Sequence, residues 1–292
     1  MGKSIIRILQ PGDEAALEAF LLPRLDSSMF LIGNMRASGL IDIGHPYAGT
    51  YAAAFEGEKI TAVAAHYWNQ VLVFQAPEHI DLLWPEAVRA SKRPIAGLIG
   101  PDEQVMRVKE DLEIKNSVIK MDEAEQLFSL NLADLIEPEA LTRGEVRGRR
   151  IVTSDLDLIT RWRVAYTIEA LGDQESPELW NDSRTAIQRS LDEGRTWILE
   201  DNGQPVACSS FNTVISEAVQ VGGVWTPPEL RGRGYGRCVV AASLSTARAE
   251  GVEKAILFTG VTNLAAQKAY IVLGFKLRGG YRVTLMHPPI TL

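Results

Sequence analysis

The chain has 292 residues, of which 46% are hydrophobic and 23% charged, a composition typical of globular proteins. Because a single hydrophobic core stops growing at about 250–300 residues, this length favours two domains over one. The net charge of −7 argues against a general nucleic-acid binder. No uncharged apolar run reaches the roughly 18 residues that a membrane helix needs, and the first residues lack the apolar stretch of a signal peptide. We therefore expect a cytoplasmic protein that binds neither nucleic acid nor membranes.

Charge is distributed unevenly along the chain. Residues 1–140 contain 12 Lys and Arg against 21 Asp and Glu, a net charge of −9, whereas residues 141–292 contain 18 against 16, a net charge of +2. The second half is therefore the better place for an anionic ligand. Cys208 and Cys238 are too few for a disulfide framework or a cysteine-rich zinc site, and the four histidines show no metal-ligand spacing. We expect no metal centre.

The first half of the chain is predicted to mix helices and short strands. Apolar spacing and turn residues indicate helix 12–25, strands 51–55, 59–66 and 71–75, helix 81–90, strand 95–99 and helix 103–111. Residues 114–150 then carry mixed charges and a proline, which is typical of a domain boundary. We place the division near residue 140, which gives domains 1–140 and 141–292.

The second half repeats that order more clearly. Its predicted elements are strand 149–152, helices 155–170 and 177–193, strands 196–199, 205–212 and 218–226, helix 236–250, strand 255–259, helix 263–273 and a final strand pair that begins at 275 and is broken at 279–280. Both halves thus contain hairpin strands, a helix, a strand and a helix, which suggests an internal duplication. The expected fold class is α/β, in the sense of a mixed α+β fold.

One segment between a predicted strand and a predicted helix carries the strongest functional signal. It reads Val224-Trp225-Thr226-Pro227-Pro228-Glu229-Leu230-Arg231-Gly232-Arg233-Gly234-Tyr235-Gly236. Its glycines can adopt positive φ and leave backbone N–H groups uncovered. It leads into a helix N-terminus, where unpaired N–H groups and the helix dipole favour an anion, and its arginines add positive charge. The segment therefore predicts a cradle for a pyrophosphate.

Two other interpretations of this segment stay open at this point. It can be an ordinary glycine-rich turn with solvated arginines. It can also be an arginine–glycine segment that binds RNA, although such segments are long and disordered, whereas this one is short and flanked by apolar elements. The glycine spacing does not match the dinucleotide-binding fingerprint, and no G-K-[ST] follows as in a P-loop.

A second motif follows 27 residues after Gly236, and it reads Asn263-x-x-Ala266-x-x-x-Tyr270-x-x-x-Gly274-Phe275. On a helix, its asparagine, alanine and tyrosine share one face. Together with the earlier Arg231-x-x-Gly234-x-Gly236, this motif makes residues 148–287 resemble the GCN5-related N-acetyltransferase (GNAT) family. The order of elements in the first half makes the whole chain similar to tandem GNAT proteins with a degenerate N-terminal domain.

The resemblance implies two GNAT-like domains, each a mostly antiparallel mixed sheet flanked by helices. It implies that acetyl-coenzyme A, the co-substrate, lies between the strands 218–226 and 255–259. The residues that would bind it are Val224, Trp225 and Thr226 along the pantetheine arm, Arg231, Gly232, Arg233, Gly234, Tyr235 and Gly236 around the pyrophosphate, and Asn263. Tyr270 would protonate the departing thiolate, and Glu217 is the nearest match for the general base.

The resemblance also implies what the protein does. Acetyl transfer to a primary amine, in a small molecule, an amino acid or a peptide, is the expected reaction, and no metal is needed. The alternative is a non-catalytic protein that binds or senses acyl-coenzyme A. A homodimer is left open.

Two further expectations concern the two halves separately. In the first half, we take the turn at 100–104 as the equivalent of the phosphate-binding loop. Its two carboxylates and lack of a glycine triplet predict that residues 1–140 have no cofactor site. In the second half, Trp162, Trp180 and Trp197 either line an acceptor pocket or belong to the core.

Overall fold

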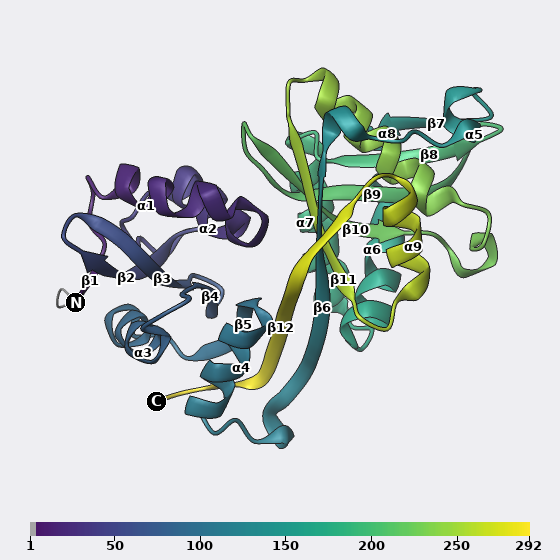
Figure 1. Ribbon diagram of the computed structural model, residues 1–292. Helices are drawn as coiled ribbons and strands as arrows, with labels where there is room; N and C mark the ends of the chain where they lie inside the picture. The colour runs from purple at the N-terminus through teal and green to yellow at the C-terminus, as the bar shows by residue number, and fades with distance from the viewer. Residues whose placement is uncertain (1–3) are drawn as a thin grey trace. The chain divides into compact units, whose positions relative to one another are not determined.

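The computed structural model describes residues 4–292, which form two compact units (Figure 1). Unit 1 contains the described residues up to Leu127 together with Arg278–Leu292, and unit 2 is Phe128–Leu277. This division differs from the expected single boundary near residue 140. The reason is that the strands β6 (Ile119–Asn131) and β12 (Lys276–Ile290) each contain a unit boundary, so the end of the chain returns to unit 1.

Unit 1 is a mixed sheet with helices on both faces. Its other elements are β1 (Ile5–Ile8), α1 (Glu14–Leu21), η1 (Leu22–Arg24), α2 (Leu25–Ser38), β2 (Gly49–Glu56), β3 (Lys59–Tyr67), β4 (Val71–Gln75), α3 (Ile80–Ser91), β5 (Ile95–Pro101), α4 (Asp102–Asp111) and η2 (Asn116–Val118). The strand order is β1-β2-β3-β4-β5-β12-β6, in which β4 and β5 are parallel. The neighbouring pairs from β1 to β4, and the pair β5 and β12, are antiparallel.

Successive side chains of a strand point to opposite faces of the sheet, so the buried residues of unit 1 form a core layer on each face. Ala52, Ala64 and Phe74 pack with α3 and α4 on one face, as strand periodicity requires. Figure 1 shows α1 and α2 on the other face. There Tyr67 donates a hydrogen bond to the buried Tyr51 at 3.0 Å. The helix α2 was missing from the predicted elements, since its apolar residues give only a weak helical stripe.

Glu125 on β6 is a half-buried acid in unit 1, and its buried Oε2 atom has no hydrogen-bond partner among the described residues. Burial, with a smaller effect of Glu123, raises the pKa of Glu125 from 4.5 to about 7. The folded state therefore holds this proton more tightly than the unfolded chain does. Stability should fall as the pH rises from about 4.5 to about 7 and should then level off.

We expect Glu125→Gln to remove this loss, because the amide has the same shape and no charge. The variant should match the wild type near pH 4 and exceed it at pH 8, by on the order of 2–3 kcal/mol of unfolding free energy. Urea titrations at several pH values measure the difference. Glu123→Gln, at the exposed neighbouring acid, is the control and should change the profile only slightly. Equal profiles for Glu125→Gln and the wild type would contradict the expectation.

Unit 2 repeats the same plan. Its other elements are η3 (Leu132–Asp134), α5 (Glu139–Thr142), β7 (Val146–Arg150), η4 (Thr153–Asp155), α6 (Leu156–Leu171), α7 (Pro177–Asp192), β8 (Thr196–Asp201), β9 (Gln204–Val214), β10 (Ala218–Trp225), η5 (Pro228–Leu230), α8 (Tyr235–Ala249), β11 (Lys254–Gly260) and α9 (Leu264–Val272). The strand order is β6-β11-β10-β9-β8-β7. The strands β10 and β11 have a parallel register, while the hairpins from β7 to β10 are antiparallel.

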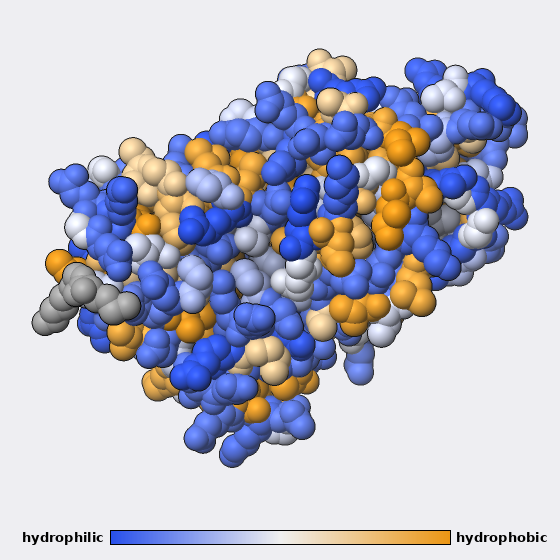
Figure 2. Space-filling view, viewed as in Figure 1, coloured by the Kyte–Doolittle hydropathy of each residue, from blue (hydrophilic) through white to orange (hydrophobic). Residues whose placement is uncertain are grey.

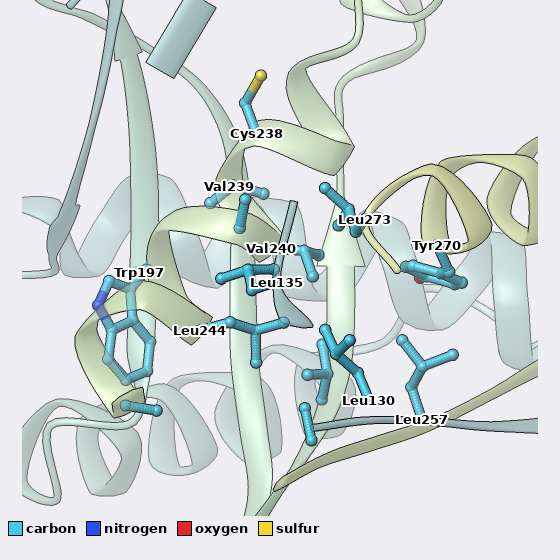
Figure 3. Packing of buried hydrophobic residues seen from close by; sticks show 14 of the residues in the cluster. Leu130, Leu135, Trp197, Cys238, Val239, Val240, Leu244, Leu257, Tyr270 and Leu273 are labelled. Carbon is cyan, nitrogen blue, oxygen red and sulfur yellow. The ribbon is translucent and has the colours of Figure 1, made fainter. Parts of the chain in front are cut away.

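Two hydrophobic clusters hold the helices of unit 2 on opposite faces of its sheet. Figure 3 shows the larger one, in which Val240 and Leu244 of α8 lie near Leu257 and Tyr270. The smaller cluster joins α6 and α7 to the other face through residues such as Ile159, Ile187, Cys208 and Trp225. Burying an apolar side chain of this size contributes about 1.5–3 kcal/mol, so these contacts fix where the ends of β10 and α9 lie.

Several predicted elements of the second half are confirmed, and two are corrected. The strands β8, β9 and β10 and the helices α8 and α9 lie within a few residues of the predicted ranges. The predicted break at 279–280 is wrong, because β12 continues through both glycines to Ile290. The segment 114–150 does contain a unit boundary, but this boundary lies between Leu127 and Phe128, within the thirteen residues of β6, and not near residue 140.

The face of the protein drawn in Figure 2 is mostly hydrophilic. Figure 2 shows apolar side chains gathered over α9, where Leu264 is 61% exposed and Ile271 55%. No helix among the described residues is long and apolar enough to cross a membrane.

Candidate active site

The loop between β10 and α8 presents uncovered backbone N–H groups. Gly234 is the N-cap of α8 with a φ of 81°, and no side chain caps the first turn of that helix. Gly232 has a φ of 80°, and a Cβ added there would meet nothing within 4 Å. In the described chain, no acceptor takes a hydrogen bond from the backbone N–H groups of residues 232–234. Glycine avoids the roughly 1–2 kcal/mol that other residues pay in this left-handed region. The loop therefore fits an anion at the helix N-terminus.

Arg231 fastens this loop to its surroundings. Its Nε donates to the backbone oxygen of Thr226 at 3.0 Å, and its guanidinium pairs with Glu169 of α6 at 2.9 Å. The guanidinium also lies 4.9 Å from the ring centroid of Trp225. Both ionic side chains are about half exposed, so the ion pair contributes at most about 1 kcal/mol. Its effect is to keep one side of the loop against α6 and the end of β10.

Tyr235 fastens the other side of the loop. Its hydroxyl donates to a carboxylate oxygen of Asp201, in the turn between β8 and β9, and this bond raises the pKa of Tyr235. Arg233 and Arg237 are exposed and have no carboxylate partner among the described residues. Their charges are therefore available to an anion in front of the loop.

The parallel strands β10 and β11 are paired over a short stretch only. Their register in the described chain covers three pairs, which end at Gln220 and Ile256, although both strands continue. Register shifts between β9 and β10 follow directly, after Gln220 and again after Gly222. Such bulges bend a strand and increase its twist. The ends of β10 and β11 that approach the loop are therefore unpaired with each other, and Val224 lies on that part of β10.

The helix α9 carries the two residues of the second motif. Asn263 is its N-cap, since the Asn263 Oδ1 accepts a hydrogen bond from the backbone N–H of Ala266 at 3.1 Å. Tyr270 is 9% exposed and contacts Phe275 edge-on at 5.9 Å between ring centroids. Figure 3 shows its ring between α9 and Leu257 of β11. Tyr270 is therefore a core residue that also lies near the unpaired ends of β10 and β11.

These features can now be compared with known proteins. Residues 158–275 match the model of the acetyltransferase (GNAT) family. The C-terminal unit carries a GNAT domain. No curated protein matches the sequence.

Solved structures resemble the whole chain, beyond this GNAT domain. A Drosophila protein that is 15% identical has a TM-score of 0.67 and is aligned over 97% of this chain and 99% of its own. A GCN5-related N-acetyltransferase from Sphaerobacter thermophilus is 14% identical with a TM-score of 0.57, over 99% and 98%. A tandem GNAT protein from the clavulanic acid biosynthesis pathway is 12% identical with a TM-score of 0.54, over 99% and 100%. The chain therefore has the fold of two GNAT-like domains in tandem.

The GNAT domain places Glu217 in the turn before β10. Its carboxylate accepts a hydrogen bond from the Ser216 hydroxyl at 2.8 Å, and its backbone oxygen accepts from Lys254 N–H at 3.2 Å. The phosphate-binding loop follows the other end of β10, about 26 Å away along an extended strand. A role for Glu217 as general base stays a prediction.

Sequence reasoning missed Gln220, which lies at the last paired position of β10 and β11. Its Nε2 donates to the backbone oxygen of Val221 at 2.9 Å, whereas its Oε1 is buried and accepts no hydrogen bond. A buried acceptor without a donor is costly, so a ligand N–H at this point would be favoured. Nothing in the sequence distinguished this glutamine, because its importance comes from where the strand pairing ends.

The three tryptophans considered for an acceptor pocket lie in different surroundings. Trp197 is a core residue, 4.6 Å from Phe211 between ring centroids. Trp180 is exposed, and its Nε1 donates to Glu175. Trp162 alone lines a small pocket on the α6 face of the GNAT domain.

In unit 1, the element order identifies residues 76–79, between β4 and α3, as the counterpart of the phosphate-binding loop. The expectation that the turn at 100–104 is this counterpart is wrong, since that turn joins β5 to α4. The backbone N–H of Ala76 is already bound by Gln104 Oε1 at 2.7 Å. A Cβ on Gly100 would lie 3.2 Å from the backbone oxygen of Phe74, so β4 and β5 are still adjacent one residue beyond their last register pair. Residues 76–79 contain no glycine and no arginine, and Glu78 adds a negative charge, so this segment is less suited to an anion than the loop of unit 2.

Proposed function

We propose that the protein transfers an acetyl group from acetyl-coenzyme A to a primary amine. The observation that carries the proposal is the loop of the GNAT domain, whose uncovered N–H groups at 232–234 follow the unpaired ends of β10 and β11. Its counterpart in unit 1, residues 76–79, contains no glycine and no arginine. Arg233 and Arg237 beside the loop, which have no carboxylate partner among the described residues, support binding of a pyrophosphate by charge.

In the proposed complex, the loop N–H groups and the first turn of α8 hold the pyrophosphate. Backbone groups of Val224 and Thr226 pair with the pantetheine arm. The Asn263 Oδ1 caps α9, which leaves its Nδ2 to donate to the co-substrate. The backbone oxygen of Thr226 already accepts a hydrogen bond from Arg231. This bond holds the loop against the end of the segment that would pair with the pantetheine arm.

In the proposed reaction, the neutral amine nitrogen attacks the thioester carbonyl carbon. The C–N bond forms, the C–S bond breaks, and Tyr270 gives its hydroxyl proton to the departing thiolate, while the amine proton leaves to solvent or to a base. A phenol and an alkyl thiol have similar acidity, so this proton transfer is matched. Thiol release from acetyl-coenzyme A across a panel of amines tests the proposal. Coenzyme A binding without thiol release for any amine would instead support a sensing protein.

The contrast between the two units leads to a prediction about stoichiometry. Isothermal titration of the full chain with coenzyme A should give one site per chain. Gly234→Asp should give none, because unit 1 offers no second site. A stoichiometry of two, or one remaining site in the variant, would show that unit 1 binds the ligand after all.

A further inference from the structure

The helix α6 places an arginine on the stripe that faces the sheet. Ile159, Arg163 and Tyr166 are spaced at i, i+4 and i+7, and all three line one pocket. The residues of this α6 pocket that matter here are Trp162, Arg163, Tyr166, Cys208, Gly223 and Trp225. A positive charge in the middle of an otherwise apolar stripe needs a reason, since a buried charge is costly without a partner.

Arg163 has no ion-pair or hydrogen-bond partner among the described residues. Five arginines of the described chain are half-buried, namely Arg93, Arg149, Arg163, Arg195 and Arg282. The other four each pair with a carboxylate: Asp42, Asp155, Glu193 and Asp102 in the same order. No described residue forms an ion pair with Arg163 or accepts a hydrogen bond from it. Because a guanidinium stays charged at any working pH, a carboxylate of a bound molecule would be favoured beside it.

The rest of the α6 pocket is uncharged and mostly apolar, with Ser210 as its one hydroxyl from serine or threonine. Tyr166 and Trp225 meet edge to face at 6.4 Å between ring centroids. Burial raises the pKa of the Cys208 thiol to about 12, against a smaller opposite effect of Arg163, so the thiol is neutral. The enclosed space is about 20 Å³, which is room for one or two water-sized groups. A carboxylate group has this size, and the aromatic rings around it suit the carbon chain that carries it.

The position of the pocket connects it with the reaction. Gly223 and Trp225 flank Val224, the residue whose backbone would pair with the pantetheine arm. We propose that Arg163 binds the carboxylate of the amine acceptor, which makes the acceptor a free amino acid with an apolar side chain. This inference rests on the proposed acetyl transfer and narrows its substrate class.

The test compares acceptors that differ only in the carboxylate. Phenylalanine and phenylalaninamide, and leucine and leucinamide, form two such pairs. For the wild type, kcat/KM should be on the order of 10²-fold higher for each free acid, the usual effect of a charge-assisted pair. Arg163→Met, which keeps the length and apolar stem, should lose this preference mainly through KM. Arg161→Met, at the exposed neighbour on α6, should keep it, and both variants should retain coenzyme A binding.

The outcomes separate the two proposals. Thiol release with equal use of acid and amide, or an unchanged preference in Arg163→Met, would overturn the role of Arg163 and leave acetyl transfer standing. If no amine supports thiol release, the proposed acetyl transfer is wrong. A binding experiment then tests whether Arg163 recognises a carboxylate. N-acetylphenylalanine and its amide are titrated against the coenzyme A complex by calorimetry. A preference for the acid that Arg163→Met removes supports the inference, and equal binding overturns it.

Discussion

Gly234→Asp is expected to abolish coenzyme A binding while the protein still folds. The new carboxylate would stand in front of the uncovered N–H groups of the loop and repel a pyrophosphate. A Cβ at this position lies 3.1 Å from Arg237 Nε, so the aspartate would also pair with this arginine beside the loop. Thermal unfolding measures the effect, because the wild type should gain about 2.7 kcal/mol at a ligand concentration of 100 times Kd. The variant should gain nothing.

A matched control separates the loss of binding from backbone strain. Gly144 lies in the turn before β7 with a φ of 72°, and a Cβ added there meets nothing within 4 Å. Gly144→Asp therefore introduces the same charge at a similarly strained backbone position, away from the loop. Both variants should lose comparable stability without ligand, and only Gly234→Asp should lose the shift. A full coenzyme A shift in Gly234→Asp would move the binding site away from this loop.

Tyr270→Phe is expected to reduce turnover by roughly 10²–10⁴-fold with little change in coenzyme A affinity. The substitution removes the proposed proton donor and keeps the ring that packs against Phe275. Steady-state kinetics with one active amine, alongside a coenzyme A titration, measures both quantities. Since the hydroxyl acts only when the C–S bond breaks, the loss of activity should appear as a lower kcat.

Loss of a buried tyrosine hydroxyl elsewhere serves as the control. Tyr51 in unit 1 is 1% exposed and hydrogen-bonds to Tyr67, so Tyr51→Phe removes a comparable group. It should lower stability by about 1 kcal/mol and leave kcat unchanged. Equal turnover of Tyr270→Phe and the wild type would remove Tyr270 from the mechanism and reduce it to a core aromatic.

Much of the fold of unit 2 could be predicted from local patterns. The hairpin from β8 to β9 is marked by the turn at Asn202 and Gly203, and α8 ends at Ala249, just before Gly251 with its positive φ. The loop glycines were likewise visible, because a positive φ beside a helix N-terminus requires glycine wherever the rest of the chain lies. These features depend on contacts within a few residues, so the sequence specifies them directly.

Side-chain roles were harder to predict than backbone roles. The arginine Arg231 looked like a ligand-binding charge, yet its guanidinium holds Thr226 and Glu169. Asn263 carries the helix cap in addition to its predicted role. Arg163 could not be singled out from the sequence, since a lone arginine in a helix gives no local signal. It stands out only in the structure, where no described carboxylate pairs with it.

The sequence by itself determined the elements, their order, the glycine loop and the GNAT resemblance, because each depends on periodicity or on spacing along the chain. Only the tertiary structure decided the unit boundaries, the counterpart loop at 76–79 and the end of pairing at Gln220. These depend on which distant strands become neighbours: β12 returns to pair with β5, and the bulges after Gln220 release β10 from β11. Pairing between residues far apart in the chain is set by the packing of whole faces, and no short segment contains that information.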